Sequence, residues 1–106
     1  MTTYFVTRHP GAVAWAKSIG LQYDVHLEHL LALAQIQAED IVIGTLPINI
    51  VYALNKKGVR YVHLSLNIPP TLRGVELDVE QLKQCQATLE EFAVEKKSSE
   101  FDKLAY

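Results

Sequence analysis

The segment 40–47, with the sequence D-I-V-I-G-T-L-P, constrains the fold of this chain most strongly. Three consecutive β-branched residues at 41–43 predict a strand that is buried on both faces, as strands are in a parallel sheet. Gly44 allows a close backbone approach, and Pro47 suits the first turn of a helix. The segment therefore predicts a strand, a turn and a helix in succession.

The rest of the chain repeats this alternation of strands and helices. β-Branched and aromatic residues predict strands at 4–7 and 60–66, and a weaker alternating pattern predicts one at 23–27. An apolar stripe predicts a helix that begins near Gly11 and is closed by Gly20. Segment 30–36 fits either a helical turn or irregular structure. The chain is therefore expected to form an open, mainly parallel α/β sheet with flanking helices.

The C-terminal third predicts one amphipathic helix followed by a charged tail. Asp78 is a suitable N-cap residue, with Gln81 three positions on as its reciprocal partner. Cys85 lies on the apolar stripe and is expected to be an inert core thiol. The segment 95–100 is charged and is expected to fray. The stripe has spacings of three and four and comprises Leu82, Cys85, Leu89 and Phe92, and the tail adds Phe101, Leu104 and Tyr106 as residues available to dock.

Length and composition indicate one ordinary globular domain. The chain has 106 residues, of which 49% are hydrophobic, so we expect a single domain at 1–106 with a core at about 3–94 and a tail at about 95–106. The net charge of -2 argues against duplex nucleic acid as a partner. One cysteine excludes an internal disulfide. Neither a signal peptide nor a bilayer-spanning apolar run is evident, so a cytoplasmic protein with no membrane partner is expected.

Polar side chains follow three of the expected strands, at the edge where parallel α/β sheets bind ligands. Thr7, Arg8 and His9 come directly before a helix, whose N-terminal N–H groups favour anions. Guanidinium and hydroxyl groups suit phosphate. The alternative is a set of turns whose polar residues merely face water. The remaining candidate residues lie in the same turns and in the loop at 67–74: Gly11, Gly44, Thr45, Ser65, Asn67 and Arg73.

Several familiar sites are disfavoured. A Walker loop and a G-x-G-x-x-G loop are both absent, which argues against nucleoside triphosphate hydrolysis and dinucleotide-dependent hydride transfer. Arg8-His9 precedes proline, whereas histidine phosphatases carry R-H-G, so that likeness is accidental. The acidic and histidine residues within 24–29 match no zinc spacing, and His63 is expected to be a satisfied, partly buried histidine. No metal and no cofactor are therefore expected.

Four motifs stand out along the chain: V-T-R-H-P-G-A at 6–12, D-I-V-I-G-T-L-P at 40–47, R-Y-V-H-L-S-L at 60–66 and P-P-x-L-R-G at 69–74. Together they resemble a family of small accessory proteins found beside type III CRISPR systems. The resemblance covers about residues 3–78, in matching order. It implies a Rossmann-like fold and a ring nuclease that degrades cyclic oligoadenylate messengers, tetraadenylate foremost, and so switches antiviral signalling off.

The resemblance also suggests roles for the candidate residues. Attack by a ribose 2′-hydroxyl on the adjacent phosphorus needs no metal where the protein aligns the groups and neutralises the developing charge. Arg8 and Arg73 are the candidates for charge neutralisation. His9 is the candidate for proton transfer or for phosphate binding alone. The hydroxyl groups of Thr7, Thr45 and Ser65 are candidates for positioning phosphate or ribose.

The symmetry of a cyclic oligoadenylate leads us to expect a homodimer, with its two-fold axis through the ligand. Two other functions fit the same sequence. A binding protein would sequester the messenger without cutting it. An interaction subunit would instead dock on the CRISPR machinery through the C-terminal helix and the aromatic tail.

Overall fold

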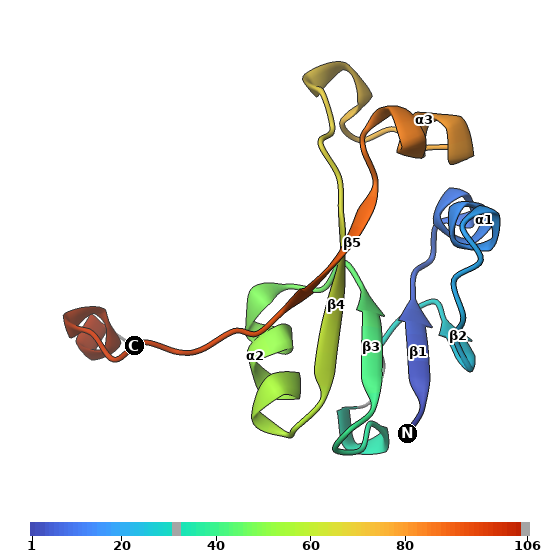
Figure 1. The fold of residues 1–106 in the computed structure, drawn as a ribbon. Helices are drawn as coiled ribbons and strands as arrows, with labels where there is room; N and C mark the ends of the chain where they lie inside the picture. The colour runs from blue at the N-terminus through green and yellow to red at the C-terminus, as the bar shows by residue number, and fades with distance from the viewer. Residues whose placement is uncertain (31–32, 105–106) are drawn as a thin grey trace.

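The computed structural model describes residues 1–30 and 33–104, which form an α/β fold around a five-stranded sheet (Figure 1). The strand order is β2-β1-β3-β4-β5. The pairings from β2 to β4 are parallel, and β5 pairs antiparallel with β4. The predicted open, mainly parallel, Rossmann-like sheet is thus confirmed. The strands are β1 (Thr3–Val6), β2 (Val25–Leu27), β3 (Ile41–Gly44), β4 (Arg60–Ser65) and β5 (Thr88–Phe92).

Helices cover both faces of this sheet (Figure 1). α2 (Ile48–Lys56) packs on one face, whereas α1 (Pro10–Ser18) and α3 (Val79–Gln84) pack on the other. The helices predicted after β1 and β3 are confirmed. Short 3-10 turns lie at Leu33–Gln35, Pro70–Leu72 and Glu100–Leu104, so the ambiguous segment 30–36 contains one helical turn, while its residues 31–32 lie outside the described part of the chain.

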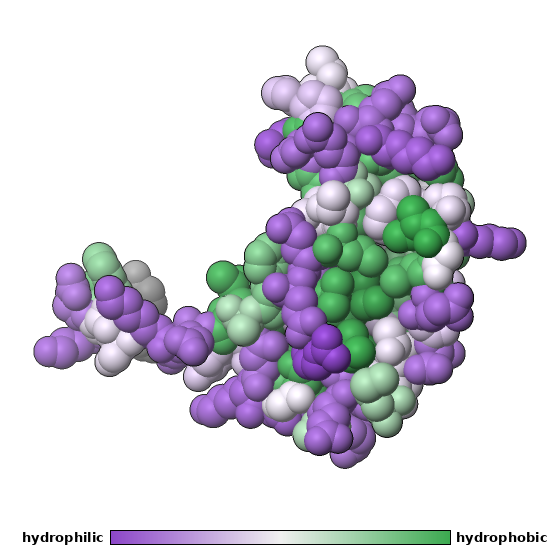
Figure 2. Space-filling view, in the orientation of Figure 1, coloured by the Kyte–Doolittle hydropathy of each residue, from purple (hydrophilic) through white to green (hydrophobic). Residues whose placement is uncertain are grey.

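The two faces of the sheet build two halves of the hydrophobic core. β3 serves both halves, because Val42 is buried toward α2 and Ile43 toward α1 and α3, as the β-branched run predicts. Figure 2 shows hydrophobic side chains gathered over the middle of the molecule, with hydrophilic residues around them. The half under α1 and α3 contains Phe5, Ala12, Trp15, Ala16, Ile43, Leu64 and Leu82, and the half under α2 contains Val6, Ile36, Val42, Val51, Leu54, Val59 and Tyr61.

The prediction that one helix extends to Phe92 is wrong. α3 begins with the predicted capping box, in which the side chains of Asp78 and Gln81 each accept the backbone N–H of the other residue. The helix ends at Gln84, and Gln86 then adopts a left-handed backbone conformation with φ of 58°, which ends the helical path. The following segment pairs with β4 as strand β5.

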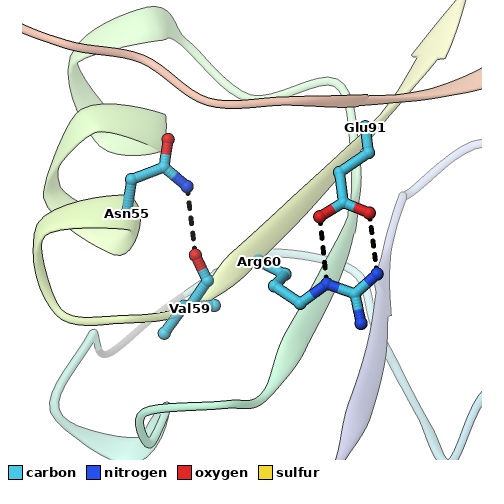
Figure 3. A network of polar contacts seen from close by, with 4 residues as sticks. All are labelled: Asn55, Val59, Arg60 and Glu91. Atoms are coloured by element: carbon cyan, nitrogen blue, oxygen red, sulfur yellow. Dashed lines mark hydrogen bonds and ion pairs between the residues drawn. The ribbon is translucent and has the colours of Figure 1, made fainter.

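The apolar spacing at 82–92 is compatible both with one continuous helix and with a helix followed by a strand. Leu82 is buried from α3, while Leu89 packs against the same half of the core from β5. Pairing with β4 gives the backbone of 88–92 its hydrogen-bond partners. Arg60 on β4 also donates two hydrogen bonds to the Glu91 carboxylate, at 2.9 and 2.7 Å (Figure 3). Because both side chains are about half exposed, this ion pair adds little stability by itself and chiefly fixes the register. Cys85, the predicted core thiol, is buried and free.

A buried carboxylate fixes the start of β3. Asp40 is 4% exposed and accepts the N–H groups of Thr2 and Gln37, each at 2.8 Å, on different carboxylate oxygens. The carbonyl oxygen of Asp40 also accepts the N–H of Arg60 at 3.0 Å. The hydrogen bonds from Gln37 and then Thr2 hold the pKa of Asp40 below its ordinary value. Asp40 therefore joins the amino-terminal ends of β1, β3 and β4.

Two glycines permit backbone contacts that a side chain would block. A Cβ atom at Gly11 would lie 1.8 Å from the carbonyl oxygen of Leu77, so α1 touches the segment before α3 directly. A Cβ atom at Gly44 would lie 2.8 Å from the carbonyl oxygen of Val6, across the β1–β3 pairing. Packing therefore accounts for glycine at both positions, which the sequence marks as candidate ligand residues.

The C-terminal tail leaves the domain after Val94. The N–H of Val94 donates to Oδ1 of Asn55 on α2 at 2.7 Å. Nδ2 of Asn55 donates in turn to the carbonyl oxygen of Val59 at 3.0 Å (Figure 3). Beyond this anchor the tail projects from the body (Figure 1), and Phe101 and Leu104 stay largely exposed, while Tyr106 lies outside the described residues. None of the helices in the described part of the chain is long and apolar enough to cross a membrane.

Replacing Asp40 with asparagine is expected to lower the free energy of unfolding at neutral pH, because an amide offers one acceptor oxygen where the carboxylate uses two. The folded-state pKa lies below the ordinary value of 3.8, so the stabilisation is complete above that value and is lost as the pH falls through the folded-state pKa. Urea unfolding of wild type and Asp40→Asn between neutral pH and about pH 2 should show the stability difference shrinking in acid. A constant difference would contradict this account.

Gly11→Ala is expected to destabilise the domain by about 3 kcal/mol or more, because the added methyl group must push α1 away from Leu77. Gly74→Ala is the matched control. Gly74 has a φ of +79° and nothing within 4 Å of an added Cβ, so its substitution should cost only the left-handed backbone penalty of about 1 kcal/mol. Chemical denaturation of both variants measures the difference, and equal losses would show that α1 shifts freely.

Candidate functional site

The strand order places a reversal point between β1 and β3. β1 has β2 on one side and β3 on the other, which is the flavodoxin-like arrangement. In such sheets ligands bind outside the carboxyl ends of the two strands at the reversal point. Thr7 follows β1 and Thr45 follows β3, and the register pairs Val6 with Gly44. The two threonines therefore leave the sheet next to each other at the expected ligand crevice.

The turn after β1 is held from β2. The N–H of Thr7 donates to the carbonyl oxygen of Leu27 at 2.9 Å, and Nε2 of His26 lies 2.8 Å from the carbonyl oxygen of Thr7. The hydroxyl oxygen of Thr7 accepts the N–H of His9 at 3.2 Å. His9 is the N-cap residue of α1, but its side chain does not cap the helix. These hydrogen bonds hold the backbone of the turn, while the side chains of Arg8 and His9 stay exposed.

The turn after β3 is held by a buried tyrosine. The hydroxyl of Tyr61 donates to the carbonyl oxygen of Gly44 and accepts the N–H of Leu46, both at 2.9 Å. Nδ1 of His63 lies 2.7 Å from the same hydroxyl, so the prediction of a satisfied, partly buried histidine is confirmed. Burial raises the pKa of Tyr61, so the phenol stays protonated and keeps donating at neutral pH. Tyr61 thereby positions the backbone on both sides of Thr45.

Two hollows of different character meet at these turns. Three residues line both of them, namely Thr7, His9 and Thr45. The first hollow, of about 280 Å³, lies between α1, α3 and the end of β4, and its other walls are apolar: Ala12, Leu64, Leu66, Ile68, Val75, Leu77 and Leu82. The second, of about 260 Å³, has a more polar lining: Val6, Arg8, Glu28, His29, Leu30 and Leu46.

Arg8 is the cation best placed for an anion at this crevice. Its side chain is exposed and, within the described part of the chain, makes no ion pair. It lines the polar hollow and also a neighbouring one that is bordered by His9, Gly74 and Glu76. An exposed guanidinium without a carboxylate partner can bind phosphate without first breaking an existing ion pair.

The other candidate residues lie apart from this group. Arg73 and Asn67 line a different hollow, together with Gln84 of α3. Nδ2 of Asn67 donates to Oε1 of Gln86 at 2.8 Å, which ties the start of this loop to the α3–β5 turn. Ser65 is half-buried and pairs with Thr88 on β5. The structure thus brings Thr7, Arg8, His9 and Thr45 together, and the Arg73 loop reaches them through Gly74, Val75 and Glu76 instead.

Several residues at the crevice carry no sequence signal for this role. Tyr61 and His26 act on the turns through hydrogen bonds that only the strand order reveals. Glu28 and His29 enter the polar hollow because β2 ends beside β1. Among the described residues, no group of three or more His, Cys, Asp or Glu side chains could hold a metal ion.

Fold and crevice together define a Rossmann-like α/β domain with its candidate ligand site at the β1/β3 reversal point. Residues 4–95 match a family model described as "Putative CRISPR-associated protein (Cas_VVA1548)". Since the match spans most of the chain, this protein belongs to that CRISPR-associated family. The expectation of a CRISPR-associated protein is confirmed, whereas the ring-nuclease subtype stays a prediction. No curated protein and no solved structure matches the chain.

Tyr61→Phe is expected to loosen the turn after β3, because the N–H of Leu46 and the carbonyl oxygen of Gly44 both lose a partner. The cost should be about 1–3 kcal/mol in the free energy of unfolding. Hydrogen exchange should show faster exchange at the Leu46 amide. Tyr52→Phe on α2 is the control, for which the Leu46 amide should exchange at the wild-type rate. Unchanged exchange in Tyr61→Phe would remove Tyr61 from its positioning role.

Proposed function

We propose that this protein is a ring nuclease that binds and cleaves a cyclic oligoadenylate, preferentially the tetraadenylate, and so ends type III CRISPR signalling. Membership of a CRISPR-associated family supports the biological setting. The observation that carries the chemistry is the convergence of Thr7, Arg8, His9 and Thr45 on the β1/β3 reversal point. These side chains offer a guanidinium, an imidazole and two hydroxyls, which suit a phosphodiester.

The proposed reaction is an internal transesterification. The ribose 2′-oxygen forms a bond to the adjacent phosphorus, the bond from phosphorus to the 5′-oxygen breaks, and one proton passes from the 2′-hydroxyl to the leaving 5′-oxygen. The products are a linear oligoadenylate with a 2′,3′-cyclic phosphate and a free 5′-hydroxyl. Arg8 would neutralise the developing charge on the phosphate, and His9 would transfer the proton or hold the phosphate. The hydroxyls of Thr7 and Thr45 would align the ribose with the phosphorus.

The symmetry of the ring favours two protein copies around one ligand. In a homodimer with its two-fold axis through the ring, each copy would supply the same groups to opposite phosphates. Arg73, which lies apart from Arg8 within one copy, would then need its loop or the second copy to bring it to the ligand. Testing Arg73→Ala beside Arg8→Ala separates a role at the phosphate from a role elsewhere.

Two alternatives have their own support. Sequestration of the uncut ring would use the same crevice. An interaction role is favoured by the projecting tail, on which Phe101 and Leu104 are exposed without packing against the domain.

The deciding experiment incubates pure protein with labelled cyclic tetraadenylate and hexaadenylate in the presence of a chelator. Linear products that end in a cyclic phosphate are expected. Tight retention of the intact ring would indicate sequestration. Failure to bind either ring would overturn both readings and leave the interaction role.

Arg8→Ala is expected to lower the cleavage rate by about a hundredfold or more, because an electrostatic contact to the developing charge is lost. The fold should be unaffected, since Arg8 is exposed and has no ion-pair partner in the described chain. Single-turnover assays measure the rate, and thermal melting measures the fold. Lys96→Ala in the tail removes a cation that is also exposed and should keep the wild-type rate. If Arg8→Ala cleaves as fast as Lys96→Ala, Arg8 is not at the reacting phosphate.

A further inference from the structure

The apolar hollow beside the reversal point is open to solvent and is enclosed by side chains from several elements. Its walls come from α1, the end of β4, the following loop and α3, through Ala12, Leu64, Val75 and Leu82. Val75 is 51% exposed, so the hollow opens at the surface and is not a void in the core. An apolar hollow rimmed by a few polar groups is the usual form of a small-molecule site.

From this arrangement we infer that the apolar hollow is a nucleobase subsite, which holds one adenine of a nucleotide whose phosphate lies at Arg8. The assignment rests on the proposed function for the identity of the nucleotide, but its geometry is independent of any cleavage. Bases are flat and weakly polar on their faces, and proteins hold them by stacking between apolar side chains while polar groups contact their edges.

The lining separates base from phosphate. None of the described residues that line the apolar hollow is Asp, Glu, Lys or Arg, so a phosphate there would lose hydration without gaining a cation. Arg8 lines the polar hollow on the other side of the shared rim. Thr7, His9 and Thr45 form that rim and offer hydroxyl and imidazole groups that can donate to or accept from a base edge or a ribose.

The volume also favours a single base. At about 280 Å³ the hollow lies at the lower limit of the roughly 300–1,000 Å³ typical of drug-sized ligands. One heterocycle fits such a space, whereas a whole cyclic oligonucleotide does not. The rest of the ring would then lie outside, across the Arg8 side of the crevice.

The test compares AMP with ribose 5-phosphate, two probes that differ only in the base. NMR titration should show that wild type binds AMP about tenfold or more tightly than ribose 5-phosphate, because the apolar walls remove the faces of the base from water. Val75→Trp, which fills the hollow from an exposed position, should erase this preference, so that the variant binds AMP and ribose 5-phosphate equally. Val75 also lines the hollow beside Arg8, so the readout is the ratio of the two affinities within the variant. Ile19→Trp is the matched control, because Ile19 is 50% exposed and lies at the other end of α1, and it should keep the preference.

Each outcome bears on the base subsite and on the proposed function separately. Equal binding of the two probes by wild type, or a preference for AMP that survives in Val75→Trp, overturns the base subsite even if wild type cleaves the cyclic tetraadenylate. A preference that Val75→Trp erases supports the subsite even if wild type leaves the ring intact, in which case the proposed cleavage fails alone. Binding of neither probe and of no ring overturns both. Thermal melting of Val75→Trp should match that of Ile19→Trp, which shows that the lost preference does not come from unfolding.

Discussion

β1 and β3 pair in parallel at a contact that a side chain at position 44 would obstruct. An added Cβ there would meet the carbonyl oxygen of Val6 at 2.8 Å. Val6 lies opposite Gly44 in this pairing, so the next residues, Thr7 and Thr45, follow the ends of the two strands side by side. Both hollows of the candidate site share these two residues. The position of the crevice thus follows from one backbone contact inside the sheet.

Hydrogen bonds from neighbouring strands hold the backbone of the two turns at the crevice, although Arg8, His9 and Thr45 are exposed. Tyr61 approaches from the α2 side and holds the backbone around Thr45, while His26 approaches from β2 and holds the carbonyl oxygen of Thr7. Neither supporting residue needs to touch a ligand. Rigid turns with free side chains allow charged and hydroxyl groups to be presented without the cost of ordering the backbone on binding.

Sequence reasoning succeeded where local chemistry and burial agree. The run at 41–43 has one consistent outcome, because three β-branched residues suit a doubly covered strand, and the positions of Thr7 and Thr45 at one edge then follow from parallel pairing. It failed at 85–92, where Leu82 and Leu89 reach the same half of the core from a helix and from a strand. Only pairing with the partner strand β4, where Val62 lies opposite Glu91 and Arg60 bonds to the Glu91 carboxylate, decides between the two. The path of the 66–77 loop, which separates Arg73 from Arg8, likewise depends on contacts across the fold, such as the one from Asn67 to Gln86.

The arrangement of cations bears on how one small domain would handle a cyclic ligand. The sequence predicts two arginines at the site. Within one chain, Arg8 lies at the reversal point, whereas Arg73 lines another hollow. A ring of phosphodiesters presents several equivalent anions, so a single guanidinium would neutralise only one of them. A second copy related by a two-fold axis would supply a second Arg8 at an equivalent phosphate without any new sequence element. A net charge of -2 is compatible with such an arrangement, because two Arg8 side chains around one ring would not require a broadly basic surface.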